Sequence, residues 1–290
     1  MAEFLQFLFA GLTSGAIYAL VALGFTLIYS SSHVINFAQG EFVMLGGLAT
    51  VGLLAAGVPL LPAALLAIVL TAAAGIALEK LAIEPARNAA VVTLIIITIG
   101  ASILLRGAAQ LIWGKDYHRL PAFTGETPLE IGGATLLPQS LWVIGVTILI
   151  VLGLRWFFGR TLLGKAVLAT SHNRLAAQLV GIDIGFVLLL SYGLSAALGA
   201  LAGILIAPIT LTSYTVGTML GLKGFCAAIV GGLGSGAGAV VGGLVVGLAE
   251  AMATGYVSSA YKDAVAFVII LVVLVFMPSG LFGRRGTDRV

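Results

Sequence analysis

The sequence predicts an all-α polytopic membrane protein with about eight or nine transmembrane helices, some of them short or broken. The 290-residue chain is 60% hydrophobic and only 9% charged, whereas about 25% of residues are charged in a typical soluble domain. Apolar segments of about 20 residues, which is the length that crosses a bilayer as a helix, recur along the chain. Because the polar intervals are short, residues 1–290 are expected to form a single transmembrane domain.

The expected spans follow from this length requirement. They cover residues 8–29, 36–56, 62–83, 91–112, 140–158, 186–208, 217–232, 236–255 and 263–280. The first is expected to be retained, because the basic n-region of a cleavable signal is missing before it. The seventh and eighth are separated by only a few residues. They are therefore either two short helices or one interrupted element followed by a span.

Glycine is unusually dense in the last third of the chain. Eight glycines lie between Gly231 and Gly247, in a stretch without charge from Gly224 to Ala249. Irregular backbone at membrane depth is tolerated only where protein covers it or where it lines a polar pathway. Several of these glycines are spaced by four, which is also typical of close helix packing. The segment therefore predicts a broken or very closely packed helix.

A polar break, residues 30–41, interrupts the first half of the chain much as the glycines interrupt the second. Paired interruptions are typical of transporters built from an inverted repeat, with the pathway at the repeat interface. The alternative for the first break is a loop whose Glu41 stabilises the first turn of the next helix. Eight residues are candidates for the translocation pathway: Asn36, Gln39, Gly40, Glu41, Gly231, Gly232, Gly234 and Gly236.

Basic residues predict the orientation, because they are enriched in cytoplasmic loops. On this rule the interval 155–185 and the C-terminus are cytoplasmic, and an odd number of spans leaves the N-terminus outside. The basic residues on the cytoplasmic side are Lys80, Arg87, Arg155, Arg160, Lys165, Arg174, Arg284, Arg285 and Arg289. Those on the other side are Lys115, Arg119 and Lys262. Arg106, close to the end of a span, is expected to extend toward the interface.

Residues 159–185 are too polar to span the membrane, and they predict one short amphipathic cytoplasmic helix. Leu168, Leu175, Leu179 and Ile182 recur at near-helical spacing. An apolar stripe in a cytosolic segment favours docking into a groove of a partner protein. The alternative is packing against the chain's own helices.

Several other chemistries are excluded by context. Gly159–Lys165 fits the start of a phosphate-binding loop, but Ala166 stands where a Mg²⁺-binding hydroxyl is required. Gly234–Ala239 fits a loose dinucleotide-binding pattern without the surrounding βαβ unit. The three histidines are scattered without ligand spacing, so a metal site is not expected. No cofactor or catalytic group is expected. A nucleic-acid partner is not expected either, since basic residues beside spans account for the net charge of +3.

With these segments established, the chain resembles the permeases of branched-chain amino acid ABC transporters, specifically the shorter of the two permease subunits. The resemblance rests on separated blocks in the right order. They are residues 15–29, 35–41, 159–183, 222–247, 261–263 and 277–280. It departs from the family at Thr170–Asn173, where an acidic pair is common.

The resemblance implies a non-enzymatic subunit of a bacterial or archaeal cytoplasmic-membrane importer. The implied partners are a second homologous permease, two cytosolic ATPases and a periplasmic or lipid-anchored solute-binding protein. It also implies that residues 159–183 couple to an ATPase. The candidate coupling residues are Gly164, Leu168, Asn173, Arg174, Leu175, Leu179 and Gly181.

Two alternatives remain open from the sequence. One is an ABC permease for amides, urea or another small polar solute, because specificity lies largely with the binding protein. The other is a self-sufficient secondary transporter or channel. Such a transporter would place ionisable residues at the membrane midplane, whereas Glu41, Lys223, Glu250 and Asp263 are expected mostly near span ends.

Overall fold

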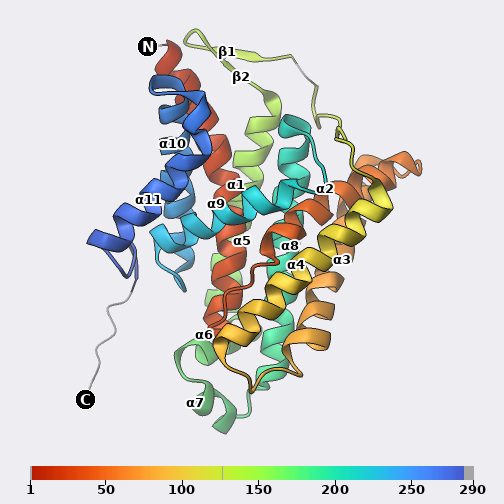
Figure 1. Cartoon of the computed structure of the whole chain (residues 1–290), viewed down its shortest axis with the longest axis vertical. Coiled ribbons are helices and arrows are strands. Elements are labelled where there is room, and N and C mark those ends of the chain that lie inside the picture. Colours follow the sequence, from red (N-terminus) through yellow and green to blue (C-terminus); the bar gives the residue numbers. More distant parts are fainter. Residues whose placement is uncertain (1, 126, 284–290) are drawn as a thin grey trace.

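The computed structural model describes residues 2–125 and 127–283 as a bundle of helices (Figure 1). The bundle contains eleven α-helices within these ranges, a π-helical turn, a 3₁₀ turn and one β-hairpin. The helices are α1 (Ala2–Ser32), α2 (Gln39–Ala55), α3 (Leu60–Leu78), α4 (Val91–Trp113), α5 (Pro138–Arg160), α6 (Leu162–His172), α7 (Arg174–Leu179), α8 (Ile184–Thr210), α9 (Val216–Gly231), α10 (Gly236–Tyr256) and α11 (Lys262–Phe276). The π turn, Glu79–Ile83, extends α3, and the 3₁₀ turn, Ser259–Tyr261, precedes α11.

The predicted spans are confirmed as helices. Seven helices of the described chain are long and apolar enough to cross a membrane, and α2 and α9 are shorter apolar helices of 17 and 16 residues. The segment 217–255 forms two separate helices, which settles the alternative left open above. Short helices therefore accompany full spans, as expected for a broken-helix architecture.

The long helices α1 and α8 form the centre of the bundle. Helix α1 has 31 residues, a length of about 46 Å, and every residue from Gly15 to Ile28 is buried. A helix that is apolar all round is stable only when other helices surround it. Helices α3, α4, α5 and α11 instead bury at most five residues each and expose many large apolar side chains, as expected for helices that face lipid or a partner subunit.

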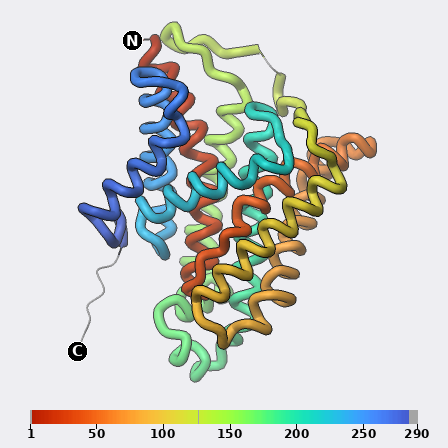
Figure 2. Tube along the Cα trace, in the orientation of Figure 1, coloured from red at the N-terminus to blue at the C-terminus, as the bar shows by residue number. Residues whose placement is uncertain are grey.

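The chain contains two similar units, α1–α4 and α8–α11, connected through α5–α7. Each begins with a long central helix, reverses into a short helix and continues with two spans. Because α8 starts at the end of the bundle that α1 reaches, the two units run in opposite directions (Figure 2). This arrangement is an inverted repeat, as the sequence predicts.

The two breaks that correspond in this repeat differ from the pair that the sequence suggested. The break after α1 matches residues 211–215 after α8, not the glycine-rich residues 232–235. His33 and Leu211, each directly after its long helix, have φ angles of 58° and 65° and are the two non-glycine residues with positive φ in the described chain. Because Leu211 carries none of the usual sequence signals of a left-handed turn, the second break was missed.

A short β-hairpin was also missed. Strands β1 (Leu129–Ile131) and β2 (Ala134–Leu136) pair in antiparallel fashion across Gly132 and Gly133. Both glycines have positive φ, as a two-residue hairpin turn requires. The hairpin lies beside the N-terminus, at the end of the bundle opposite α6 and α7 (Figure 1).

Candidate functional site

The two short helices meet at their N-terminal ends. Gly40 is the second residue of α2, and Gly217 is the second residue of α9. A Cβ atom on either glycine would overlap the carbonyl oxygen of the other, and a Cβ on Gly221 would lie 2.8 Å from the Cα of Gly40. Glycine is therefore required where the two backbones cross.

Beside this crossing lies a partly buried polar cluster from α2 and α4. The Glu41 carboxylate, 2% exposed, accepts a hydrogen bond from Ser102 Oγ at 2.9 Å and pairs with Arg106 Nη2 at 3.0 Å. Arg106 also donates to Ser102 Oγ at 3.3 Å. Arg106, which was expected to extend toward the interface, pairs with this buried carboxylate while its side chain stays 33% exposed. Charges at membrane depth pair in this way because an unpaired charge is costly there.

A cavity of about 150 Å³ adjoins both the crossing and the polar cluster. Its polar lining comes from Glu41, Ser102, Arg106 and Thr218. The rest of its wall is apolar or glycine: Phe25, Phe37, Gly40, Ile99, Gly217, Gly221, Leu222 and Phe225. A small polar solute with an apolar portion could occupy such a space.

The other two polar candidates of the first break hold the chain in place. Asn36 is buried, and its Oδ1 accepts a hydrogen bond from the amide of Ala38. Gln39 is fully buried, donates to the carbonyl of Ser195 at 3.1 Å and accepts from the Ser195 hydroxyl at 2.6 Å. Asn36 thus fixes the loop before α2, and Gln39 joins the start of α2 to α8. Of the four candidates, only Gly40 and Glu41 line the cavity.

The glycines of the second break do not lie beside the candidate residues of the first break. A Cβ on Gly231 would overlap the Gly238 carbonyl, so Gly231 packs α9 against α10. Gly232 and Gly234 have φ angles of 100° and 89° and form the turn between these helices. Gly236 begins α10 next to Leu23. The eight candidates are thus divided between two places.

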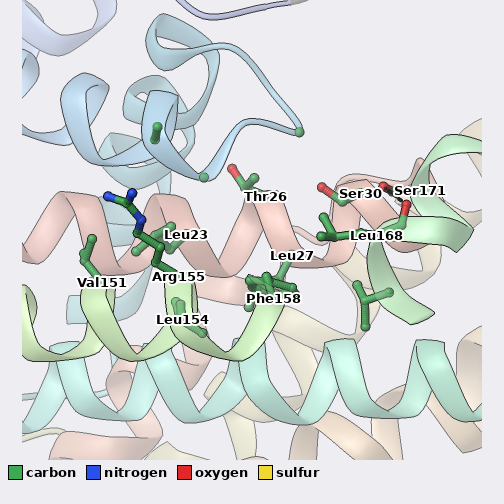
Figure 3. Close-up of a pocket in the computed structure, with 14 residues that line it drawn as sticks. Leu23, Thr26, Leu27, Ser30, Val151, Leu154, Arg155, Phe158, Leu168 and Ser171 are labelled. Atoms are coloured by element: carbon green, nitrogen blue, oxygen red, sulfur yellow. Dashed lines mark hydrogen bonds between the residues drawn. The ribbon is translucent and has the colours of Figure 1, made fainter. Parts of the chain in front are cut away.

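Gly234 and Gly236 line a different cavity, of about 360 Å³, between α1, α5, α6 and the α9–α10 turn. Its wall is mostly apolar, with polar groups from Thr26, Ser30, Ser171 and the charged Arg155. Figure 3 shows Ser30 on α1 close to Ser171 and Leu168 on α6. This cavity therefore connects the central helix to the segment predicted to couple to a partner.

That segment is two helices rather than the single helix predicted. Helix α6 ends at His172 and α7 begins at Arg174, because Asn173 is extended and its side chain caps α7 through the amide of Ala176. Gly181, with φ at 87°, ends the segment. The break means that the predicted stripe does not run along one helix face.

The leucines of α7 project away from the bundle. Leu175 and Leu179 are 73% and 89% exposed, and Ala177 between them is buried. Leu168 on α6 is half-exposed, and Arg174 is exposed. Gly164 is buried against the end of α5, where a Cβ would overlap the Phe157 carbonyl. The exposed leucines are therefore available to a partner, while Gly164 fixes α6 to the bundle.

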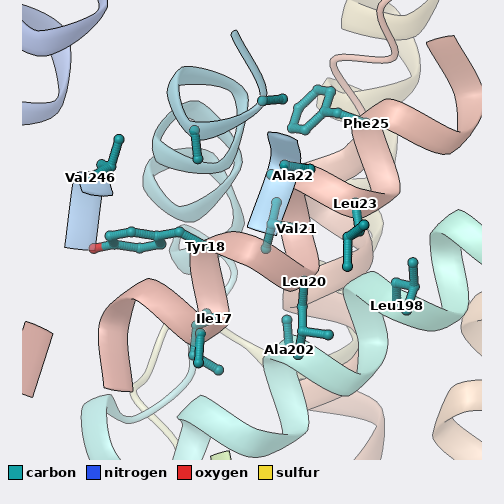
Figure 4. Close-up of a cluster of buried hydrophobic side chains, with 14 of the residues drawn as sticks. Ile17, Tyr18, Leu20, Val21, Ala22, Leu23, Phe25, Leu198, Ala202 and Val246 are labelled. Carbon is teal, nitrogen blue, oxygen red and sulfur yellow. The ribbon is translucent and has the colours of Figure 1, made fainter. Parts of the chain in front are cut away.

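A second ionic cluster was not predicted. Lys223 Nζ, at the middle of α9, lies 3.0 Å from Glu250 Oε1 and 2.6 Å from Asp263 Oδ1, and Lys262 Nζ lies 3.5 Å from Glu250. Tyr18 donates to Glu250 Oε2 at 2.9 Å, and Figure 4 shows its ring extending from α1 toward α10. Lys223 and Glu250 are buried within helices, so the expectation that they lie near span ends is wrong. Four helices are joined here.

The comparisons with known proteins agree with this architecture. The family described as the branched-chain amino acid transport system permease component matches residues 7–274. The permease protein LivH of the high-affinity branched-chain amino acid transport system of Escherichia coli K12 is 35% identical, over 99% of this chain and 98% of its own. BraD of Pseudomonas aeruginosa, named for the same kind of system, is 34% identical over the same shares of both chains.

One solved structure, PsaBC from Streptococcus pneumoniae in complex with Fab, resembles the fold with a TM-score of 0.50 and 17% identity, over 97% of this chain and 94% of that one. Together with the apolar helices, the relatives indicate a multi-pass inner-membrane protein. The chain belongs to the family of branched-chain amino acid transport permeases, as the resemblance predicted, and is a transport subunit rather than an enzyme.

Proposed function

We propose that this chain is the permease subunit of an ATP-driven importer for branched-chain or related apolar amino acids. The observation that carries the proposal is the similarity to LivH along 99% of the chain, since LivH is named for this transport. Permeases of this family work with ATPase and other partner subunits. The partners proposed here are a second homologous permease, two cytosolic ATPases and a solute-binding protein outside the membrane.

We further propose that α6 and α7 form the ATPase-docking segment, on the cytoplasmic side. Leu175 and Leu179 lie one helical turn apart and are the most exposed leucines of α7. Burying each leucine side chain in a groove of the ATPase would contribute about 1.5–3 kcal/mol to the free energy of docking. Arg174, beside them, would form a charged rim that tunes the association rate. Thr170 belongs to the stretch Thr170–Asn173, where the family commonly has an acidic pair; it is buried, and its hydroxyl donates to the Ala166 carbonyl.

The orientation follows from the same assignment. Helix α1 runs from the N-terminus to the end of the bundle that holds α6 and α7 (Figure 1). A cytoplasmic α6–α7 therefore supports an external N-terminus. Leu281 and Phe282 donate hydrogen bonds to Val230 and Gly231 at the end of α9. The basic residues Arg284, Arg285 and Arg289 lie outside the described residues, and their charge supports a cytoplasmic C-terminus.

The docking proposal is tested by changing Leu175 and Leu179 together to Asp. This variant is expected to insert normally, because no span is altered, but to weaken ATPase docking by several kcal/mol and to lose substrate-stimulated ATP hydrolysis. Co-purification of the ATPases with the tagged permease measures docking. Leu129→Asp, on the β-hairpin at the other end, is the matched control, since Leu129 is also exposed. A double variant that retains its ATPases and its activity would mean that docking takes place elsewhere.

A further inference from the structure

Three polar atoms around the cavity between α2, α4 and α9 lack hydrogen-bond partners. Within the described chain these are Glu41 Oε2, Arg106 Nε and Thr218 Oγ1, all of them buried. All three residues line the same cavity. A buried polar atom without a partner costs about 1–3 kcal/mol, so a ligand that pairs with all three atoms would recover this free energy on binding.

The unpartnered atoms are chemically complementary to an amino acid. Glu41 Oε2 can only accept, which suits an ammonium group. Arg106 Nε can only donate, and the Thr218 hydroxyl can donate as well, which suits a carboxylate. The existing contact between Glu41 and Arg106 uses Oε1 and Nη2, so the free atoms of both residues remain available. An anion or a cation alone would satisfy only one part of this set.

The backbone around the cavity favours the same ligand. Glu41 and Thr218 are both the third residue of a short helix, and they lie on either side of the crossing of Gly40 and Gly217. The N-terminal end of a helix carries a partial positive charge that stabilises a carboxylate. In transporters built from inverted repeats, the substrate site lies at the repeat interface and broken helices direct their N-termini toward anionic groups.

The remaining wall matches an apolar side chain. Phe225 on α9 lies 5.6 Å from Phe25 and 5.5 Å from Phe37, measured between ring centroids. Ile99 and Leu222 complete this apolar surface. Aromatic and aliphatic groups of this kind bury a branched hydrocarbon favourably, because water is excluded from both surfaces.

We propose that this cavity binds a zwitterionic amino acid with an apolar side chain during its passage, with Glu41 holding the ammonium group and Arg106 and Thr218 the carboxylate. This inference rests on the proposed function and adds a site to it. The permease itself, and not only the binding protein, then discriminates between amino acids and solutes that lack one of the two charges.

The test measures binding of radiolabelled leucine to the permease–ATPase assembly in lipid nanodiscs, without the binding protein. Two competitors separate the charges: leucinamide lacks the carboxylate, and 2-hydroxy-4-methylpentanoate lacks the ammonium group. The wild-type assembly is expected to bind leucine saturably and both competitors more weakly. Glu41→Gln should weaken leucine binding by roughly tenfold or more, while binding of the 2-hydroxy acid stays unchanged.

Glu79→Gln is the matched control, because Glu79 is also buried with an unpartnered Oε2 but does not line the cavity. Its leucine affinity should equal that of wild type. Thr218→Val provides the same test from α9 and removes no existing hydrogen bond within the described chain. This variant should weaken leucine binding severalfold and leucinamide binding less, because leucinamide lacks the carboxylate.

Three results would overturn the site. The first is no saturable leucine binding by the wild type, and the second is wild-type leucine affinity in both Glu41→Gln and Thr218→Val. The third is that Glu41→Gln weakens the binding of leucine, leucinamide and the 2-hydroxy acid equally. The last would mean that Glu41 only supports the fold. ATP-driven leucine uptake by the complete wild-type importer is measured in parallel. Failure of that uptake refutes the proposed function, whereas uptake combined with any of the three results refutes this site alone.

Discussion

The contact between α1 and α10 supports a sharp prediction, because glycines on both helices let the backbones approach. Gly11 and Gly15 on α1 face Gly243 and Gly247 on α10, each pair spaced by four residues. A Cβ on Gly247 would overlap the backbone of Gly15, and a Cβ on Gly243 would overlap that of Ala19. Because these are backbone atoms, no side-chain rotation can relieve the overlap.

Gly247→Ala is therefore expected to destabilise the protein. Alanine in a helix interior is favoured over glycine by about 0.5–1 kcal/mol, but overpacking a close contact costs about 1–3 kcal/mol. Moving α10 outward also weakens dispersion contacts along the helix, since a gap of about 0.5–1 Å removes roughly a quarter to a half of the attractive energy of each contact. We expect a net loss of about 1–2 kcal/mol.

Gly236→Ala is the matched control on the same helix. The nearest atom to its Cβ would be Leu23 Cδ2 at 3.8 Å, an ordinary contact. The assay is fluorescence-detected size-exclusion chromatography after heating, which gives the temperature at which half of the monodisperse protein is lost. Gly247→Ala should lower this temperature, and Gly236→Ala should leave it nearly unchanged. Equal midpoints for the two variants would refute the account of the α1–α10 contact.

Two further predictions concern the buried ion pair of Lys223 and the topology of the chain. Lys223→Met should destabilise the protein by about 3 kcal/mol, because Glu250 loses its closest cation in a buried setting, and adding Glu250→Gln should recover most of the loss in the same heating assay. An undisturbed Lys223→Met would show that Lys262 alone balances Glu250. For topology, single cysteines at residues 2 and 288 should react with impermeant reagents from opposite sides of the membrane. Background labelling should be small because native Cys226 is buried. Labelling of both cysteines from one side would contradict the proposed orientation.

The helices could be predicted from the sequence because the bilayer imposes a length and a composition on each span. The same reasoning predicted a polar break at residues 30–41, where polar residues interrupt an apolar run, and the structure places it at residues 33–38. It failed at residues 211–215, since Leu211 is apolar and its left-handed backbone leaves no trace in composition. The hairpin at Gly132–Gly133 did carry a signal, two adjacent glycines between short strands, that could have been used.

The candidate site was only partly predictable, for a different physical reason. Glu41 stands out as an acidic residue beside a span, but its partner Arg106 is 65 positions away. Such pairing is set by tertiary packing and not by local pattern. Thr218 has no sequence signal at all, and it becomes notable only because α9 crosses α2 beside it. Conversely, the dense glycines of residues 231–247 mainly allow close packing of helices. Their spacing of four had indicated this second interpretation.

The central claim, that this chain is the permease of an ATP-driven amino acid importer, is tested most directly by uptake of radiolabelled leucine into proteoliposomes. The vesicles contain this chain, its partner permease and the two ATPases, with binding protein outside and ATP inside. We predict leucine accumulation that requires ATP and every subunit, and neither accumulation nor ATP hydrolysis by this chain alone. Accumulation by the isolated chain under an ion gradient, without ATP, would contradict the account and identify a secondary transporter.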